Sequence, residues 1–194
     1  ILLADGRSSR YGANKLLQPL AGGLTVAEAS ARALAGAVEH WLAVVAADGD
    51  PELERRLAAL GGGIVACPDA AQGMGHSIAR GVGAARQAAG WIIALADMPA
   101  VQAATIRDLR AALLAGSPIA APCRDGRRGN PIGFSSRFLP DLLALAGDRG
   151  ARALVEAHRE SVGWIETADP GIFLDVDTPA DLRSLANRSP PSWQ

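Results

Sequence analysis

Short continuous apolar runs alternate along this chain with longer segments whose apolar positions recur at helical spacing. The continuous runs predict strands buried on both faces, and the segments between them predict helices. Strands separated in this way are typical of an α/β protein with a mostly parallel sheet. The predicted strands are residues 1–4, 41–47, 63–67, 91–96, 118–122, 131–135, 163–165 and 172–176.

The segment after the second strand carries a complete set of helix signals. Asp50 is suited to cap the amino end, Pro51 to take the first helical position and Gly61 to follow the last one. One face of this helix carries Leu53, Leu57 and Leu60. The same reasoning predicts helices at 25–38, 77–90, 139–145 and 151–158.

Two further helices are predicted from the residues at their amino ends. Thr105 is placed to cap one of them, and Thr178 followed by Pro179 opens the other. Asp181 then lies where a negative charge favours the amino end of the last helix. In the helix after Thr105, we expect Ile106, Leu109 and Leu113 to face the core.

Residues 118–135 follow the alternation less regularly, which predicts either an antiparallel edge strand or a small insertion over the site. The pattern contains no internal repeat. We therefore expect one domain over residues 1–187, with a sheet of about seven strands, followed by a frayed tail at 188–194. We also expect that the first strand begins before Ile1.

Composition narrows the class of protein. Of 194 residues, 49% are hydrophobic and 20% charged, and the formal net charge of -1 comes from interspersed acids and bases. Those totals argue against a basic face for nucleic acid or for a membrane surface, and no apolar run is long enough to cross a bilayer. Cys67 and Cys123 have no metal-ligand spacing, so we expect two reduced thiols and a cytoplasmic location.

In open parallel sheets, ligands bind beyond the carboxyl ends of the strands. The loop after the first strand runs from Gly6 to Lys15, which is the only lysine among 19 basic residues. Its glycines allow backbone N–H groups to approach a phosphate, and Arg10 and Lys15 supply positive charge. The loop is neither GxxxxGK[ST] nor GxGxxG, and a merely flexible connection is the alternative.

Carboxylates follow two other predicted strands. Asp97 ends the most continuous apolar strand, and its oxygens suit a magnesium ion, although the residue could instead cap the next turn. Asp175 and Asp177 are two residues apart and would share one face of a strand, so one could bind metal while the other orients it. Capping of the last helix is the alternative for this pair.

Two more glycine-containing segments complete the candidate site. Residues 73–77, with Gly73, Gly75 and Ser77, precede a helix whose amino end can face a nucleotide. Residues 126–134 present polar groups for an anionic acceptor: Arg127, Arg128, Gly129 and Asn130. The three histidines lack a matching serine or cysteine nucleophile, which argues against triad chemistry.

Six segments, read in order, resemble the nucleotidyltransferases that act on molybdenum cofactor, and most closely the cytidylyltransferase branch. They are LADGRSSRYGANKLL, QGMGHSI, ALADMPAV, RRGNPIGF, GDRGARAL and LDVDTPADL, and the likeness extends from Leu2 to Leu185. The segments GDRGAR and RRGNP favour the cytidylyl branch over the guanylyl one. Each segment alone is weak, and six in register are specific for the superfamily.

The resemblance implies a three-layer α/β/α, Rossmann-like fold and transfer of CMP from CTP to a molybdopterin-type cofactor, with release of pyrophosphate. It assigns Mg²⁺ to Asp97 and Asp177, with Asp175 beside them, and catalysis to Lys15, Arg10 and Asp97. Arg128, Gly129 and Asn130 would bind the acceptor, and an apo-molybdenum hydroxylase would be a partner. The nucleotide would contact Leu3, Ala4, Gly6, Arg10, Lys15, Asp69, Gly73, Gly75 and Ser77.

One residue departs from the family pattern. The first loop of the family usually reads Leu-Ala-Ala-Gly or Leu-Ala-Gly-Gly, and here Asp5 stands at the third position. A carboxylate beside a triphosphate would repel it unless Asp5 points to a base, a ribose or a metal. Use of GTP, transfer to a sugar or polyol phosphate, and a non-catalytic cofactor-delivery chaperone therefore remain open.

Overall fold

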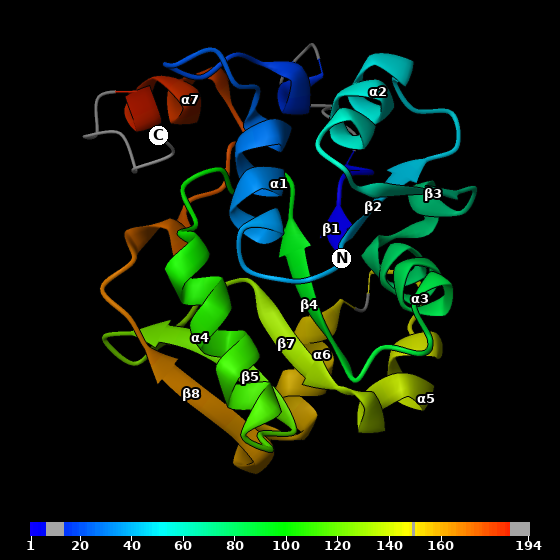
Figure 1. Cartoon of the computed structure of the whole chain (residues 1–194), viewed down its shortest axis with the longest axis vertical. Coiled ribbons are helices and arrows are strands. Elements are labelled where there is room, and N and C mark those ends of the chain that lie inside the picture. The colour runs from blue at the N-terminus through cyan, green and yellow to red at the C-terminus, as the bar shows by residue number, and fades with distance from the viewer. Residues whose placement is uncertain (7–13, 149, 187–194) are drawn as a thin grey trace.

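The computed structural model describes residues 1–6, 14–148 and 150–186. Its sheet has the strand order β3-β2-β1-β4-β7-β5-β6, and β8 pairs with β5 (Figure 1). The strands are β1 (Leu2–Leu3), β2 (Leu42–Ala46), β3 (Gly63–Cys67), β4 (Gly90–Leu95), β5 (Ile119–Arg124), β6 (Arg127–Arg128), β7 (Ile132–Ser135) and β8 (Val162–Glu166).

The pairing of the strands is mostly parallel within the amino-terminal half. β1 is parallel to β2 and β4, β2 to β3, and β5 to β8. β7 runs antiparallel to both β4 and β5, and β6 runs antiparallel to β5. The irregular segment at 118–135 contains two antiparallel strands: β7, which is paired on both sides inside the sheet, and the short β6, which pairs with β5 and ends the strand order.

The helices cover both faces of this sheet, which confirms the three-layer prediction. In Figure 1, α1 and α4 lie in front of the sheet and α6 lies behind it. The helices are α1 (Val26–Ala35), α2 (Pro51–Ala59), α3 (Met74–Ala84), α4 (Ala103–Leu114), α5 (Leu139–Leu143), α6 (Ala151–Ala157) and α7 (Pro179–Ala186). Within the described ranges, no helix is long and apolar enough to cross a membrane.

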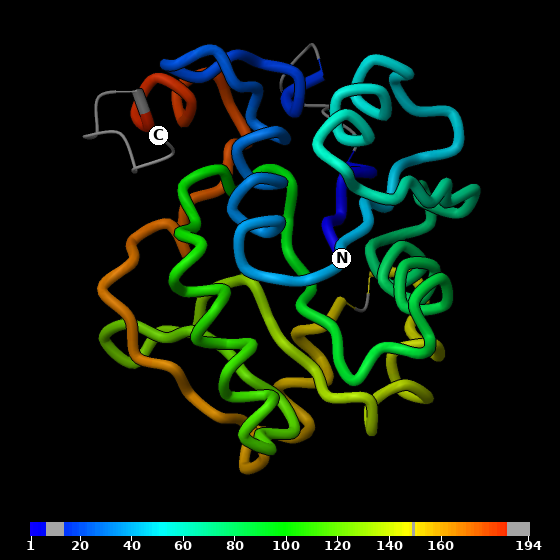
Figure 2. The backbone as a smooth tube through the Cα atoms, viewed as in Figure 1, coloured from blue at the N-terminus to red at the C-terminus, as the bar shows by residue number. Residues whose placement is uncertain are grey.

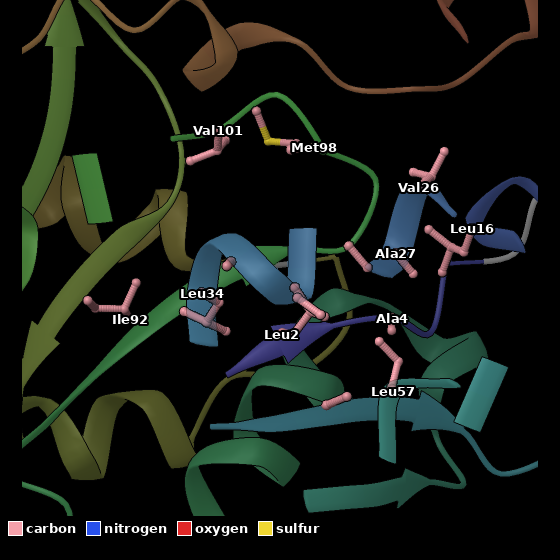
Figure 3. Close-up of a cluster of buried hydrophobic side chains, with 14 of the residues drawn as sticks. Leu2, Ala4, Leu16, Val26, Ala27, Leu34, Leu57, Ile92, Met98 and Val101 are labelled. Carbon is pink, nitrogen blue, oxygen red and sulfur yellow. The ribbon is translucent and has the colours of Figure 1, made fainter. Parts of the chain in front are cut away.

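Alternating residues of each central strand enter two separate cores. On β1, Leu2 belongs to the core under α1, α2 and α4, whereas Leu3 belongs to the core under α3, α5 and α6. On β4, Ile92 and Ile93 divide in the same way. Figure 3 shows the first core, where Leu34 of α1 and Leu57 lie around β1. Burial on both faces explains why these strands read as continuous apolar runs.

The capping signals of the second helix were predicted correctly. The Asp50 side chain accepts a hydrogen bond from the backbone N–H of Glu52 at 3.0 Å, and Pro51 begins α2. The last helix also begins as predicted, since Thr178 Oγ1 accepts from the Asp181 N–H at 3.3 Å and Asp181 Oδ2 accepts from the Thr178 N–H at 2.7 Å. Such reciprocal bonds satisfy backbone donors that a helix end leaves open.

Other predicted boundaries were wrong. Thr105 does not cap α4, which begins at Ala103, and α3 begins at Met74 and not at Ser77. The cap of α4 comes from Asp169, whose Oδ2 accepts bonds of 2.8 Å from the Gln102 N–H and from the Thr105 hydroxyl. A cap supplied by a residue so distant in sequence leaves no local signal.

The predicted strand at 172–176 is also absent. The chain forms a short 3-10 turn, η5 (Pro170–Phe173), which Asp169 caps through the Gly171 N–H at 2.8 Å. Beyond η5 the chain is extended without pairing as a strand, and the Val176 N–H donates to the Asp97 carbonyl at 2.8 Å. Figure 2 shows this orange segment passing the end of the green β4.

Candidate active site

The candidate site lies at the carboxyl ends of β1 and β4. The Ala4 N–H donates to the Val44 carbonyl at 2.8 Å, and the Ala96 N–H donates to the Leu3 carbonyl at 3.0 Å. These bonds fix where the two loops leave the sheet. Leu3 and Ala4 are largely buried and set the direction of the loop that follows, and Ala4 also lines a cavity beside that loop.

Lys15 begins a short 3-10 turn, η1 (Lys15–Leu17), that re-enters the core. The Asn14 side chain accepts from the Leu16 N–H at 3.1 Å, and Leu16 is buried in the core around β1 (Figure 3). Lys15 is therefore held by a capped turn at its backbone and by packing of its neighbour. The residue is 7% exposed, which is rare for lysine unless its ammonium is paired.

The Lys15 ammonium lies between two carboxylates. Nζ is 2.7 Å from Asp97 Oδ2 and 2.8 Å from Asp177 Oδ1. Burial by itself would lower the pKa of Lys15, but its bonds to Asp177 and Asp97 outweigh burial and raise that pKa above its ordinary value. The ammonium is thus firmly charged at neutral pH and holds together residues 82 and 162 positions away in sequence.

Backbone contacts place the two carboxylates. Asp97 lies two residues after the end of β4, and its carbonyl accepts a hydrogen bond from the N–H of Val176, one residue before Asp177. Asp181 Oδ2 accepts from the Asp177 N–H at 3.1 Å, so the cap of α7 also fixes Asp177. The other carboxylate oxygen of Asp97, Oδ1, is buried and has no hydrogen-bond partner among the described residues.

Asp175 lies at the margin of this arrangement. The residue is exposed, and its pKa is raised first by partial burial and then by the charges of Asp177 and Asp97. In the described part of the chain, no three acidic, histidine or cysteine side chains gather closely enough to hold a metal ion by themselves. An ion at this position would therefore take part of its ligands from a bound substrate.

Asp5 turns toward α3. Its carboxylate accepts a hydrogen bond from the hydroxyl of Ser77, which is fully buried in the first turn of that helix. Burial raises the pKa of Asp5, and the bond from Ser77 counters part of this effect. Asp5 also lines a cavity of about 400 Å³ together with Gly6, Asn14, Asp48 and Leu53. The carboxylate therefore has a partner of its own beside a cavity large enough for a base or a ribose.

Gly73 and Gly75, at the start of α3, make a close backbone contact with Gly147. Gly73 has φ +123°, and a Cβ there would lie 2.3 Å from the carbonyl carbon of Gly147. The Gly75 N–H donates to the Gly147 carbonyl at 2.8 Å. Gly73 and Gly75 were expected to face a nucleotide. The Gly75 N–H is already bonded to Gly147 and is therefore not available to a nucleotide in this structure. Asp69 lies on the exposed side, where its Oδ1 accepts from Gln72 at 2.6 Å.

Gly129 and Asn130 pack against η5. The Gly129 N–H donates to the Pro122 carbonyl at 2.8 Å, and a Cβ at Gly129 would lie 2.6 Å from the Ile172 Cβ. The Asn130 N–H donates to the Ile172 carbonyl at 3.0 Å. These two residues hold the segment that leads to Asp177, whereas the side chain of Arg128 lines a different cavity.

The sequence brought out Lys15, Asp97 and Asp177 as separate candidates, and the structure brings these three into contact. Arg10 lies outside the described residues. Asn14 and Asp181 were missed as residues that position the site; the sequence signal for Asn14 is its place as a helix cap directly before Lys15. Asp169 carries no local signal, because it acts on a distant helix.

Comparisons with known proteins find a matching family model and similar proteins. Residues 1–162 match the family model described as MobA-like NTP transferase domain. Purine catabolism protein PucB of Bacillus subtilis is 32% identical, with 93% of this chain and 92% of that protein covered. Nicotine blue oxidoreductase of Paenarthrobacter nicotinovorans is 30% identical, with 95% and 94% covered.

A solved structure is similar over the same length. The crystal structure of Rv0371c from Mycobacterium tuberculosis H37Rv superposes with a TM-score of 0.83 at 29% identity, covering 96% of this chain and 95% of that chain. A structure of the same mycobacterial protein in complex with manganese gives a TM-score of 0.79 at 28% identity, with 97% of both chains covered. The sheet and helices described above are therefore shared with this protein across the whole domain.

Proposed function

We propose that this chain, which belongs to the family of MobA-like NTP transferase domains, transfers CMP from CTP to the terminal phosphate of a molybdopterin-type cofactor. The observation that carries the proposal is the Lys15 ammonium held between Asp97 and Asp177 at the ends of the strands. At this edge of the sheet, the ammonium can bind the phosphate oxygens of a nucleoside triphosphate. The two carboxylates can bind a metal ion that neutralises the charge of those phosphates.

The reaction needs little covalent help from the protein. An oxygen of the acceptor phosphate attacks the α-phosphorus of CTP, a new P–O bond forms, the bond to the β-phosphate oxygen breaks, and pyrophosphate leaves with the electron pair. A phosphate monoester has a second pKa near 6, so it is already largely a dianion at neutral pH. A general base is then unnecessary, and the work of the protein is to position two anions and neutralise their charge.

Lys15 suits this task better than arginine. Its compact ammonium sits on a flexible stem, so a small movement can take it from the carboxylate oxygens to the phosphate oxygens of the substrate. A guanidinium is a wide planar fork and cannot make this exchange in the same space. We assign triphosphate binding to Lys15 and Arg10, with Gly6 allowing close approach of the backbone. The nucleoside would occupy the cavity lined by Ala4, Asp5 and Gly6.

Asp97 and Asp177 fit a divalent ion. Both present oxygen ligands to a shared cation, and the buried Oδ1 of Asp97 has no other partner in the described part of the chain. Mg²⁺ bound there would supply positive charge to the phosphates during transfer. Asp175 lies at the margin of this pair, close enough to sense their charges, and would add negative charge beside the ion. The manganese complex of the similar mycobacterial protein supports the choice of a divalent metal.

The choice of CTP rests on sequence. The segments around Arg128 and around Arg152 follow the cytidylyl branch, while Asp5 departs from it. Because Asp5 accepts a hydrogen bond from Ser77 and lines the cavity proposed for the nucleoside, its charge would act on the nucleoside. Use of GTP, or of a sugar or polyol phosphate as acceptor, would require the same centre of Lys15, Asp97 and Asp177. Only the contacts to the base and to the acceptor would differ.

A non-catalytic delivery protein is the second candidate, and the observation that favours it is the carboxylate of Asp5 in the lining of the cavity proposed for the nucleoside, where the family pattern has a small residue. Such a protein would bind nucleotide and cofactor and pass the cofactor to an apo-molybdenum hydroxylase without releasing pyrophosphate. An Asp5→Ala variant that gains transfer activity would support this candidate. A wild-type protein with sustained turnover would exclude it.

The decisive test is pyrophosphate release measured over a grid of nucleotides and acceptors, with and without Mg²⁺. We expect release from CTP with molybdopterin and Mg²⁺, and only background release with GTP or without acceptor. Equal turnover of GTP would remove the cytidylyl assignment. Pyrophosphate release with a sugar phosphate and none with molybdopterin would show that the acceptor is a sugar phosphate.

A further inference from the structure

A second cavity of about 670 Å³ lies between α6 and the strands β5, β6 and β8. Its charged lining consists of the arginines 127, 128, 152 and 159 together with Glu156. One carboxylate cannot neutralise four guanidinium groups, so the cavity carries a net positive charge. A chain with an overall charge of -1 thus concentrates positive charge at this place.

Arg128 is the innermost of these cations. Its Nη1 is buried and has no hydrogen-bond partner among the described residues. Partial burial lowers the pKa of Arg128, and the nearby charge of Arg152 lowers it further. A buried N–H donor without an acceptor is unfavourable, and so are two like charges in one cavity. An anion between them would remove both costs.

The other arginines are held in place by their surroundings. Arg152 Nε donates to Glu156 Oε1 at 2.7 Å across one turn of α6. The guanidinium of Arg127 lies 4.7 Å from the centre of the Phe173 ring, and that of Arg159 lies 5.9 Å from the centre of the Trp164 ring. Stacked guanidinium groups keep their edges available for oxyanions, which they can bind through two parallel bonds.

The cavity opens on the same edge of the sheet as the candidate active site. β5 runs parallel to β4, because both are antiparallel to β7, so Cys123 and Arg128 lie at the edge where β4 leads into Asp97. One strand, β7, separates β4 from β5, so these two strands lie about 10 Å apart at the usual spacing between strands.

We propose that this arginine-lined cavity binds a second anionic group of the acceptor substrate, distinct from the phosphate that receives the nucleotide. The ligand class is a multiply charged oxyanion, such as a phosphate or an acidic oxo group, carried by an extended molecule. Identification of the ligand as the acceptor rests on the proposed function. Binding of an oxyanion by the cavity does not.

The first test is a calorimetric titration with inorganic phosphate in the presence of saturating CTP and Mg²⁺, which occupy the triphosphate site. Arg152→Gln/Arg159→Gln replaces two exposed side chains and keeps α6 intact, and Arg128→Gln removes the buried donor. We expect each variant to bind phosphate at least tenfold more weakly than wild type. The exposed Arg86, remote from the cavity, supplies the matched control Arg86→Gln, which should bind as wild type does. Unchanged affinity in the double variant would overturn the proposal.

The second test separates the acceptor from an independent anion. In steady-state assays, the double variant should raise the KM for molybdopterin at least tenfold and leave the KM for CTP within about twofold. If phosphate binding is lost while the KM for the acceptor is unchanged, the cavity serves a separate anion and its assignment to the acceptor is wrong. If the wild type releases no pyrophosphate with any acceptor, the proposed function fails, and arginine-dependent phosphate binding still supports the anion site.

Discussion

Replacing Lys15 by methionine removes the ammonium and keeps an unbranched side chain of similar length. Asp97 and Asp177 would then face each other with carboxylate oxygens no further apart than the sum of their distances to Nζ, 2.7 and 2.8 Å. At about 5 Å and an effective dielectric constant of about 20, two such charges repel by about 3 kcal/mol. Because the Asp177 side chain is 46% exposed, solvent reduces this to an expected destabilisation of about 2 kcal/mol.

The assay is urea denaturation of wild type and Lys15→Met, each in metal-free buffer and in excess Mg²⁺. We expect the variant to lose stability without metal and to regain most of it with Mg²⁺, because the ion supplies the missing positive charge between the carboxylates. Pyrophosphate release should fall by about 10²–10³-fold, as for loss of one transition-state contact. Arg55→Met, which removes an exposed cation, should leave the urea midpoint close to that of wild type. A Lys15→Met protein as stable as wild type in metal-free buffer would refute the role of the ammonium in balancing the pair.

Three further predictions follow from individual contacts. Lys15→Arg should keep the fold by circular dichroism and lose most transfer activity, because a planar fork cannot replace the compact ammonium; retained activity would contradict this. Asp5→Asn should be more stable than wild type at pH 7, because burial raises the pKa of Asp5 and its charge therefore costs stability above that pKa. The gap should close as the pH falls toward 3.8, and urea midpoints that differ equally at both pH values would disprove the assignment. Gly73→Ala should lower the unfolding free energy by about 2 kcal/mol or more, whereas Gly22→Ala, with φ +102° and no atom within 4 Å of a Cβ, should cost only its backbone strain; equal losses in the two variants would mean that the contact with Gly147 is unimportant.

Much of the fold could be predicted because its signals are local. The alternation of apolar runs with helical periodicity gave the order of strands and helices, since each strand is buried on both faces. Asp50 and Pro51 marked the start of α2 because capping acts on the next turn of the same helix. Lys15, Asp97 and Asp177 could be singled out because each follows a predicted strand or loop at the edge where ligands bind.

The contacts between distant segments were not readable in this way. Nothing near Asp169 in sequence indicates that it caps α4, and nothing near Ile132 indicates that β7 lies between β4 and β5. The segment before Asp177 was taken for a strand, but its backbone bonds to the carbonyl of Asp97 at a single point. Such pairings depend on which surfaces meet when the sheet closes, and periodicity along one segment carries no information about its neighbour.

The sequence by itself therefore determined the order of the elements, the edge at which ligands bind and the residue types available there. Only the tertiary structure decided that one ammonium would join two carboxylates, that Asp5 would be held by Ser77, and that Arg128 and Arg152 would share a cavity. The physical reason is that propensity and capping act over a few bonds, whereas charge pairing and burial act through space between residues far apart along the chain.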